Sequence, residues 1–220
     1  MRRSLFTTSE ESSPASRVKQ WGAARTRGSS RARRRLVLGA VRLALALAVV
    51  APAAAQASAT YFTTPQVLRE FFPRSERVTY RKVAIGASHE RALSERLGYR
   101  PARKEYVIFV AYTGDHVDGY AIVDDERGQH EPITFGVKLS PEGVVERQEV
   151  MVYREKYGEE IVDPRFRAQF VGKRASDPIR AGQDVDVITG ATISSRSMAV
   201  GVRRAVALVD VLVLHPPAEG

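Results

Sequence analysis

The stretch that decides how this chain is organised reads Asp186-Val187-Ile188-Thr189-Gly190-Ala191-Thr192. A strongly helical segment follows it over residues 194–214, in which apolar side chains recur at helical spacing on one stripe. We therefore expect the stretch to be a loop that ends at the N-terminus of a long helix. Such an N-terminus holds phosphate well, because it offers unpaired backbone N–H groups and the positive end of the helix dipole.

The residue types around this junction suit a phosphate ligand. Gly190 lets the backbone approach closely or take a positive φ, Ala191 leaves the approach uncrowded, and Thr192 presents a hydroxyl that can become an ester oxygen. The alternative is an Asp or Thr cap and a glycine turn before an ordinary helix. The residues expected to contact the ligand are Asp186, Thr189, Gly190, Ala191, Thr192, Ser194 and Ser195.

The complete seven-residue stretch resembles the attachment motif of the FMN-binding domain family. That family includes the flavin subunits of the sodium-pumping NADH:quinone reductase and of the Rnf electron-transport complex, in which the last Thr of the motif carries FMN through a phosphoester bond. The resemblance implies covalent FMN on Thr192 of this chain. It also implies a flavin transferase as maturation partner, which reads Asp186.

A second region also resembles the family, in which the loop at this place reads His-x-Glu-Thr-Pro-Gly-Leu-Gly. This chain has Tyr153-Arg154-Glu155-Lys156-Tyr157-Gly158-Glu159-Glu160, followed by Gln169-Phe170, which resembles the end of a helix in relatives. Glu155 and Gly158 fit the loop pattern, while its Thr, its Pro and its second Gly are absent. The resemblance implies that Glu155 and Gly158 contact the flavin. As aromatic residues, Tyr153 and Tyr157 either stack on it or pack in the core, and Tyr157 is counted among the expected flavin contacts.

The pattern of apolar residues predicts an α+β fold, an antiparallel sheet with helices packed on it, in one domain over residues 58–220. Besides the long helix, we expect helices over residues 65–72, 88–97 and 164–171. We expect four consecutive antiparallel strands over residues 106–112, 117–124, 133–139 and 144–152.

The positive charge of the chain lies in its first part. The formal net charge is +9, and residues 1–42 hold eleven Lys and Arg against two Asp and Glu, whereas residues 43–220 hold 23 of each sign. A neutral folded part has no general electrostatic attraction for nucleic acid, so we expect no such partner.

Residues 1–57 are expected to be a disordered basic leader with a signal peptide. A basic run over residues 31–35 precedes an apolar run over 43–55, and Ala55-Gln56-Ala57 ends it in the manner of a cleavage site. The alternative is an uncleaved membrane anchor, which Arg42 and Pro52 disfavour. Either way we expect a periplasmic or other extracytoplasmic location.

The amino-acid composition limits which cofactors and catalytic groups the chain can use. The chain has no Cys, which excludes thiol chemistry and iron–sulfur clusters, and its four His lack metal-ligand spacing, so no metal site is expected. No catalytic set is visible either, so we expect an electron-transfer flavoprotein rather than a stand-alone enzyme. It would carry electrons between a membrane-associated donor and an extracytoplasmic acceptor; the alternative is a non-redox extracytoplasmic binding module without flavin.

Overall fold

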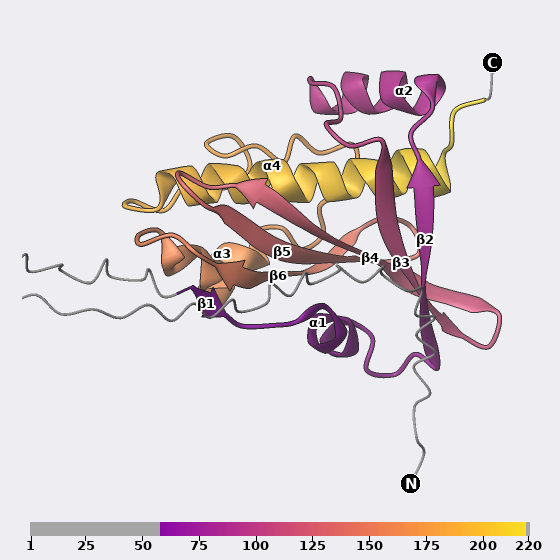
Figure 1. The fold of residues 1–220 in the computed structure, drawn as a ribbon, viewed down its shortest axis with the longest axis horizontal. Coiled ribbons are helices and arrows are strands. Elements are labelled where there is room, and N and C mark those ends of the chain that lie inside the picture. Colours follow the sequence, from indigo (N-terminus) through magenta and orange to yellow (C-terminus); the bar gives the residue numbers. More distant parts are fainter. Residues whose placement is uncertain (1–57, 219–220) are drawn as a thin grey trace, which may run out of the picture. The chain divides into compact units, whose positions relative to one another are not determined.

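A six-stranded antiparallel sheet forms the centre of the fold, with the strand order β1-β6-β5-β4-β3-β2 (Figure 1). The computed structural model describes residues 58–218, so the expected basic leader with its signal peptide or anchor lies outside the described residues. The strands are β1 (Ala59–Thr60), β2 (Arg77–Ala84), β3 (Glu105–Thr113), β4 (His116–Arg127), β5 (Pro132–Leu139) and β6 (Val145–Tyr153).

Helices cover both faces of this sheet. The long helix α4 crosses one face and the short helix α1 lies on the opposite face (Figure 1). The helices are α1 (Thr64–Phe71), α2 (Ala87–Leu97), α3 (Pro164–Ala168) and α4 (Thr192–Val209), with a 3-10 turn η1 (Glu159–Val162) and a π-helical turn η2 (Asp210–Leu214). Within residues 58–218, no helix has the length and apolar character needed to cross a membrane.

The hydrophobic core has two parts, one on each face of the sheet. Between the sheet and α4, Phe135 is fully buried, and a Cβ atom on Gly201 would lie only 2.6 Å from its ring. The glycine therefore allows α4 to lie close to β5. On the other face Val67 and Phe71 of α1 pack with Met151 of β6, and each such fully buried side chain contributes roughly 1.5–3 kcal/mol.

The predicted α+β fold is confirmed, with all four predicted strands and all four predicted helices present. Two strands were not predicted. β1 has only two residues, and most side chains of β2 are exposed, so its sequence lacks the apolar alternation of a half-buried strand. The predicted helix over residues 164–171 is shorter than expected, because α3 ends at Ala168 and Gly172 then takes a φ of +85°.

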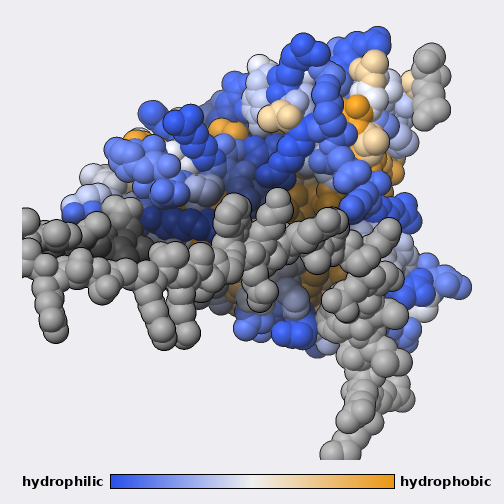
Figure 2. All heavy atoms as spheres, viewed as in Figure 1, coloured by the Kyte–Doolittle hydropathy of each residue, from blue (hydrophilic) through white to orange (hydrophobic). Residues whose placement is uncertain are grey.

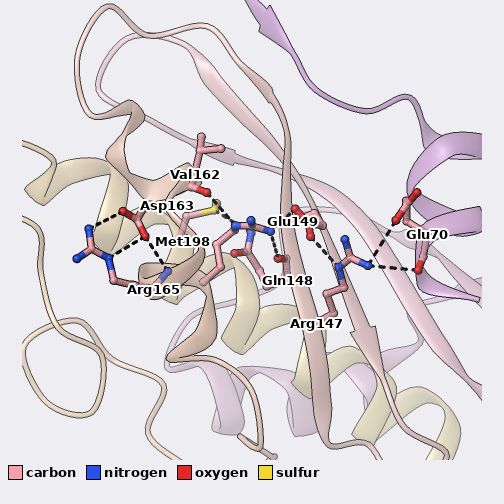
Figure 3. A network of polar contacts seen from close by, with 9 residues as sticks. Glu70, Arg147, Gln148, Glu149, Val162, Asp163, Arg165 and Met198 are labelled. Carbon is pink, nitrogen blue, oxygen red and sulfur yellow. Dashed lines mark hydrogen bonds and ion pairs between the residues drawn. The ribbon is translucent and has the colours of Figure 1, made fainter.

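A network of polar contacts fastens α3 and η1 to β6 (Figure 3). The Arg167 guanidinium pairs with Glu149 of β6 and donates from Nε to the Val162 carbonyl at 2.9 Å. The Asp163 carboxylate accepts from Arg165 N at 2.7 Å and so caps α3. These bonds hold the segment after β6 in a fixed position beside the N-terminal end of α4.

The surface seen in Figure 2 is mainly hydrophilic outside the grey residues. Few large hydrophobic side chains of the described residues are exposed, namely Tyr80, Tyr99, Tyr157, Val171 and Ile193. Two of them lie close to the start of α4 in sequence or contact: Ile193 is in its first turn, and Tyr157 is in the loop after β6.

Candidate functional site

The motif forms a tight turn that leads directly into α4. Ala191 N donates to the Ile188 carbonyl at 3.0 Å, and Gly190 has a φ of +88°, as the third residue of a type II turn requires. A second hydrogen bond stabilises the turn from its buried side, where Ser195 Oγ accepts from Ile188 N at 3.2 Å. The predicted junction between loop and helix is therefore present: Ala191 is the last residue of the loop, and α4 begins at Thr192.

The first turn of α4 begins without a side-chain cap. Ala191 is the N-cap residue, and no side chain accepts from the backbone there. Within residues 58–218, the backbone N–H groups of Thr192, Ile193 and Ser194 have no acceptor. Thr192 is half-buried, while Thr189 and Gly190 are exposed. The junction thus presents three free donors, the positive end of a long helix and an accessible hydroxyl together.

The loop after β6 lies against this first turn. Gly158 has a φ of +92°, and a Cβ atom on it would lie 2.5 Å from Ser194 Oγ and 2.7 Å from the Tyr153 hydroxyl oxygen. The Tyr153 hydroxyl is hydrogen-bonded to Ser194 Oγ at 2.9 Å and also donates to the Tyr157 carbonyl. Burial raises the pKa of Tyr153, so this hydroxyl stays protonated as a donor. The structure therefore brings the two predicted regions together.

Two of the loop residues have structural roles. The Glu155 carboxylate accepts from the backbone N–H groups of His130 and Glu131, at 2.6 and 3.0 Å, and so holds the turn between β4 and β5. Tyr153 is 2 % exposed, and its ring belongs to the core. Tyr157 is 71 % exposed, so of the two tyrosines only its ring is available to a ligand.

A cleft of about 540 Å³ lies beside the motif, and one side of it is formed by α3 and the residues before it. At its edge Asp186 N donates to the Gln169 side-chain oxygen at 2.7 Å, which ties the start of the motif to the end of α3. The lining residues are Glu160, Asp163, Arg165, Phe166, Gln169, Asp186, Val187 and Ile188.

The predicted site residues divide into three groups. Thr192 and Gly190 lie at the N-terminal end of α4, and Gly158 lies against Ser194 in its first turn. The neighbouring Tyr157 and Ile193 are exposed, Ile193 to 44 %. The hydroxyls of Ser194 and Ser195 face inward and are already hydrogen-bonded, as described above. Asp186 is exposed at the cleft rather than at the helix end.

Other contributors were missed in the sequence. Gln169 was noted only for its resemblance to relatives, and the cleft residue Phe166 lies in the predicted helix over residues 164–171 without being singled out as a site residue. No sequence signal places Gln169 against Asp186, because the contact joins residues 17 positions apart through a short helix. In the described part of the chain, no group of His, Asp and Glu side chains is arranged to hold a metal ion.

Comparison with known proteins addresses the identity of this region. Residues 128–207 match the family model of the FMN-binding domain. Among solved structures, a crystal structure of Shewanella oneidensis NqrC is similar, with 17% sequence identity, a TM-score of 0.42, and coverage of 64% of this chain and 80% of that chain. No curated protein matches the sequence. The family match extends from the end of β4 through both predicted regions into α4.

Proposed function

Since residues 128–207 of this chain are an FMN-binding domain, we propose that the protein carries FMN joined to Thr192 by a phosphoester bond and works as an exported electron carrier. The observation that carries this proposal is the N-terminal end of α4. There an accessible Thr192 hydroxyl stands beside three backbone N–H groups that lack acceptors within the described residues.

The residues present fit a phosphate group. Nothing lies within 4 Å of the position that a Cβ atom on Gly190 would take, so the turn leaves room for a ligand beside it. The free N–H groups at Thr192, Ile193 and Ser194 are oriented by the helix and are suited to donate hydrogen bonds to a phosphate oxygen. In this arrangement Thr192 supplies the ester oxygen, and the helix dipole offsets the negative charge.

When bound, FMN would supply the redox chemistry, by accepting and returning electrons. The contribution of this chain is to fix and surround it. The bond at Thr192 anchors one end, and the exposed ring of Tyr157 and the exposed Ile193 offer apolar surface beside the anchor. Gly158 keeps the loop after β6 close to α4 and so fixes where that surface lies.

The proposal places the protein outside the cytoplasm. The basic run, apolar run and Ala55-Gln56-Ala57 of the leader support export, either by a cleaved signal or with a retained anchor. A covalent bond keeps the cofactor where a diffusing one would be lost. The partners would be a flavin transferase, for which Asp186 is exposed, a membrane-associated electron donor and an extracytoplasmic acceptor.

The test is co-expression of the full chain with a flavin transferase, followed by intact mass measurement. The mass should rise by one FMN less one water, and the denatured protein should stay fluorescent. Thr192→Val removes only the hydroxyl and should abolish the shift. The matched control is Thr79→Val, the same change at an exposed position of β2 outside the motif, which should load as wild type.

The outcomes separate the alternatives. Loss of loading in both valine variants would point to a general effect of the change from threonine to valine rather than to loss of the ester oxygen. A flavin peptide mapped to Ser194 or Ser195 would move the attachment site. No flavin at all, with a competent transferase present, would leave the non-redox binding module as the function.

A further inference from the structure

Five arginines surround two adjoining cavities between α2, α4 and the loop of residues 174–181. We call this region the arginine cleft. The smaller cavity, of about 100 Å³, has four of the arginines in its lining, and the larger, of about 480 Å³, has three, so two arginines line both. The cleft arginines are Arg96, Arg174, Arg180, Arg196 and Arg203.

The positive charge of the arginine cleft is not balanced by neighbouring carboxylates. Within residues 58–218 only Arg96 forms an ion pair, with Asp210 at 2.9 Å, and the other four side chains have no ion-pair partner there. Asp177 is the one acidic residue of the smaller cavity, and its carboxylate accepts from Arg174 N at 2.8 Å. Because residues 43–220 hold 23 charges of each sign, the cluster is a local excess rather than part of a basic surface.

One of these guanidinium groups lacks an acceptor in a buried position. The Nε atom of Arg203 is shielded from solvent and has no hydrogen-bond partner among the described residues. A buried donor without an acceptor is unfavourable, and native proteins rarely leave one. Arg203 lines both cavities, so an anion held there would lie against a guanidinium group that has an unpaired donor.

The backbone of the cleft loop is held in an unusual conformation. Ile179 has a φ of +44°, the one positive φ outside glycine in the described residues. The Asp184 carboxylate accepts from Ile179 N at 3.1 Å, from Arg180 N at 2.7 Å and from Lys173 Nζ at 2.8 Å. A β-branched residue keeps such a conformation only where its surroundings enforce it, and conformations of this kind gather at ligand sites. The loop thus presents Arg174 and Arg180 from a fixed backbone.

We propose that the arginine cleft binds a phosphate-bearing anion, with a phosphoryl group in the smaller cavity and the rest of the ligand in the larger one. Guanidinium groups are suited to phosphate because their donors match its oxygens in pairs. The larger cavity lies in the size range of small-molecule sites and includes the aromatic ring of Tyr99.

This site is separate from the flavin anchor. Arg203 follows Thr192 by eleven residues on α4, which places its backbone roughly 16 Å farther along the helix. The phosphate chemistry has two possible sources, a soluble phosphate ester or the headgroup of a phospholipid. The inference does not depend on flavin loading.

The test is calorimetric titration of the flavin-free full chain with pyrophosphate, together with co-sedimentation with phosphatidylglycerol vesicles. Residues 1–42 are basic and also attract anions, so the comparison between variants decides the outcome. Arg180→Gln and Arg203→Gln should each weaken binding about tenfold. The matched control is Arg69→Gln on α1, an exposed arginine on the opposite face of the sheet, which should change binding less than about twofold.

Each outcome decides the proposal. Pyrophosphate binding that depends on Arg180 and Arg203 supports a soluble ligand, and vesicle binding alone with the same dependence supports a lipid headgroup. Equal binding by wild type, both cleft variants and the control, or no binding of either probe, would overturn it. Arg180 is exposed, so its variant remains informative if Arg203→Gln lowers the Tm. Both variants should load flavin as wild type, which keeps this test distinct from that of Thr192.

Discussion

The two ends of α4 satisfy their polar groups in opposite ways. At the C-terminal end, the helix runs into η2, where His215 N donates to the Asp210 carbonyl at 2.7 Å and the Asp210 carboxylate pairs with Arg96 and His215. At the N-terminal end no side chain caps the helix, and three N–H groups have no acceptor within the described residues.

The two ends of α4 also differ in burial. Residues 205–209 are all buried, whereas Thr192 is half-buried and Ile193 is 44 % exposed. The two ends of α4 therefore serve different purposes. Its C-terminal half stabilises the domain, and in the proposed function its first turn is open to the ligand. Variants of the buried half should lower stability without affecting flavin loading, and variants of the first turn and the turn before it should affect loading more than stability.

The largest loss of stability is expected at the buried end. Leu208 is fully buried, so Leu208→Ala should lower the free energy of unfolding by about 2–5 kcal/mol, through lost burial and the cavity left behind. Urea unfolding measures this loss, and intact mass should show flavin loading equal to wild type in the remaining folded protein. Leu208→Met keeps the volume and should cost less than about 1.5 kcal/mol. Loss of flavin loading in the folded fraction of Leu208→Ala would show that the C-terminal half of α4 also affects the ligand site.

Gly158→Ala should reduce both stability and loading, because the loop after β6 touches both. The new Cβ would crowd Ser194 Oγ at a φ of +92°, which should cost about 1–3 kcal/mol in thermal unfolding. Adding Ser194→Ala removes one of the crowded atoms, so the double variant should recover part of that loss. A double variant no better than the sum of the two singles would show that the contact between Gly158 and Ser194 does not matter.

Gly190→Val should prevent flavin loading at a cost in stability of about 1–2 kcal/mol. The position is open, so the penalty comes from the φ of +88° and not from a clash. In-gel flavin fluorescence gives the loading, and chemical unfolding gives the stability. Gly182 is a suitable control, since it has a φ of +81° with equally open surroundings, and Gly182→Val should show the same backbone cost with normal loading. Equal flavin loading in both variants would show that the turn at Gly190 does not contact the phosphate.

The smallest effect is expected from Tyr61→Phe. The Tyr61 hydroxyl donates to Glu159 of η1, and burial, followed by the hydrogen bond and charge of Glu159, raises the pKa of Tyr61 to about 12. We expect a loss of about 1 kcal/mol or less at pH 8. Because the pKa of Tyr61 is raised on folding, its hydroxyl contributes fully to the free energy of unfolding below the ordinary tyrosine pKa of 10.0. This contribution is lost as the pH rises toward 12.

The difference between wild type and Tyr61→Phe in urea unfolding should therefore shrink between pH 8 and pH 11. A difference that stays constant over this range would mean that the hydroxyl is not bound to Glu159.

The fold was predictable where apolar periodicity reflects one-sided burial. Strands β3 to β6 and helix α4 have that pattern, and each was expected close to its observed bounds. Strand β2 was missed because it is an edge strand with most side chains in solvent, so its pairing with β3 leaves no mark in the hydropathy of its own residues.

The site was predictable at the level of the loop and helix, and less so at the level of single groups. The turn at Gly190 and the helix start at Thr192 follow from local sequence. The role of Glu155 does not, because its partners are backbone groups about 25 residues away. The arginine cleft was also missed, although Arg196 and Arg203 stand seven residues apart on α4 and so share a helix face.

The uncapped start of α4 also affects how readily this part of the helix opens. A helix whose first N–H groups have no acceptor frays there more readily than elsewhere, while residues 205–209 keep the rest of it packed. Amide hydrogens of the first turn should exchange with solvent well before those of the packed half. In the proposed function, the segment that a flavin transferase would have to bind is therefore the part of the helix that opens without unfolding the domain, and a ligand fixed there would stabilise it.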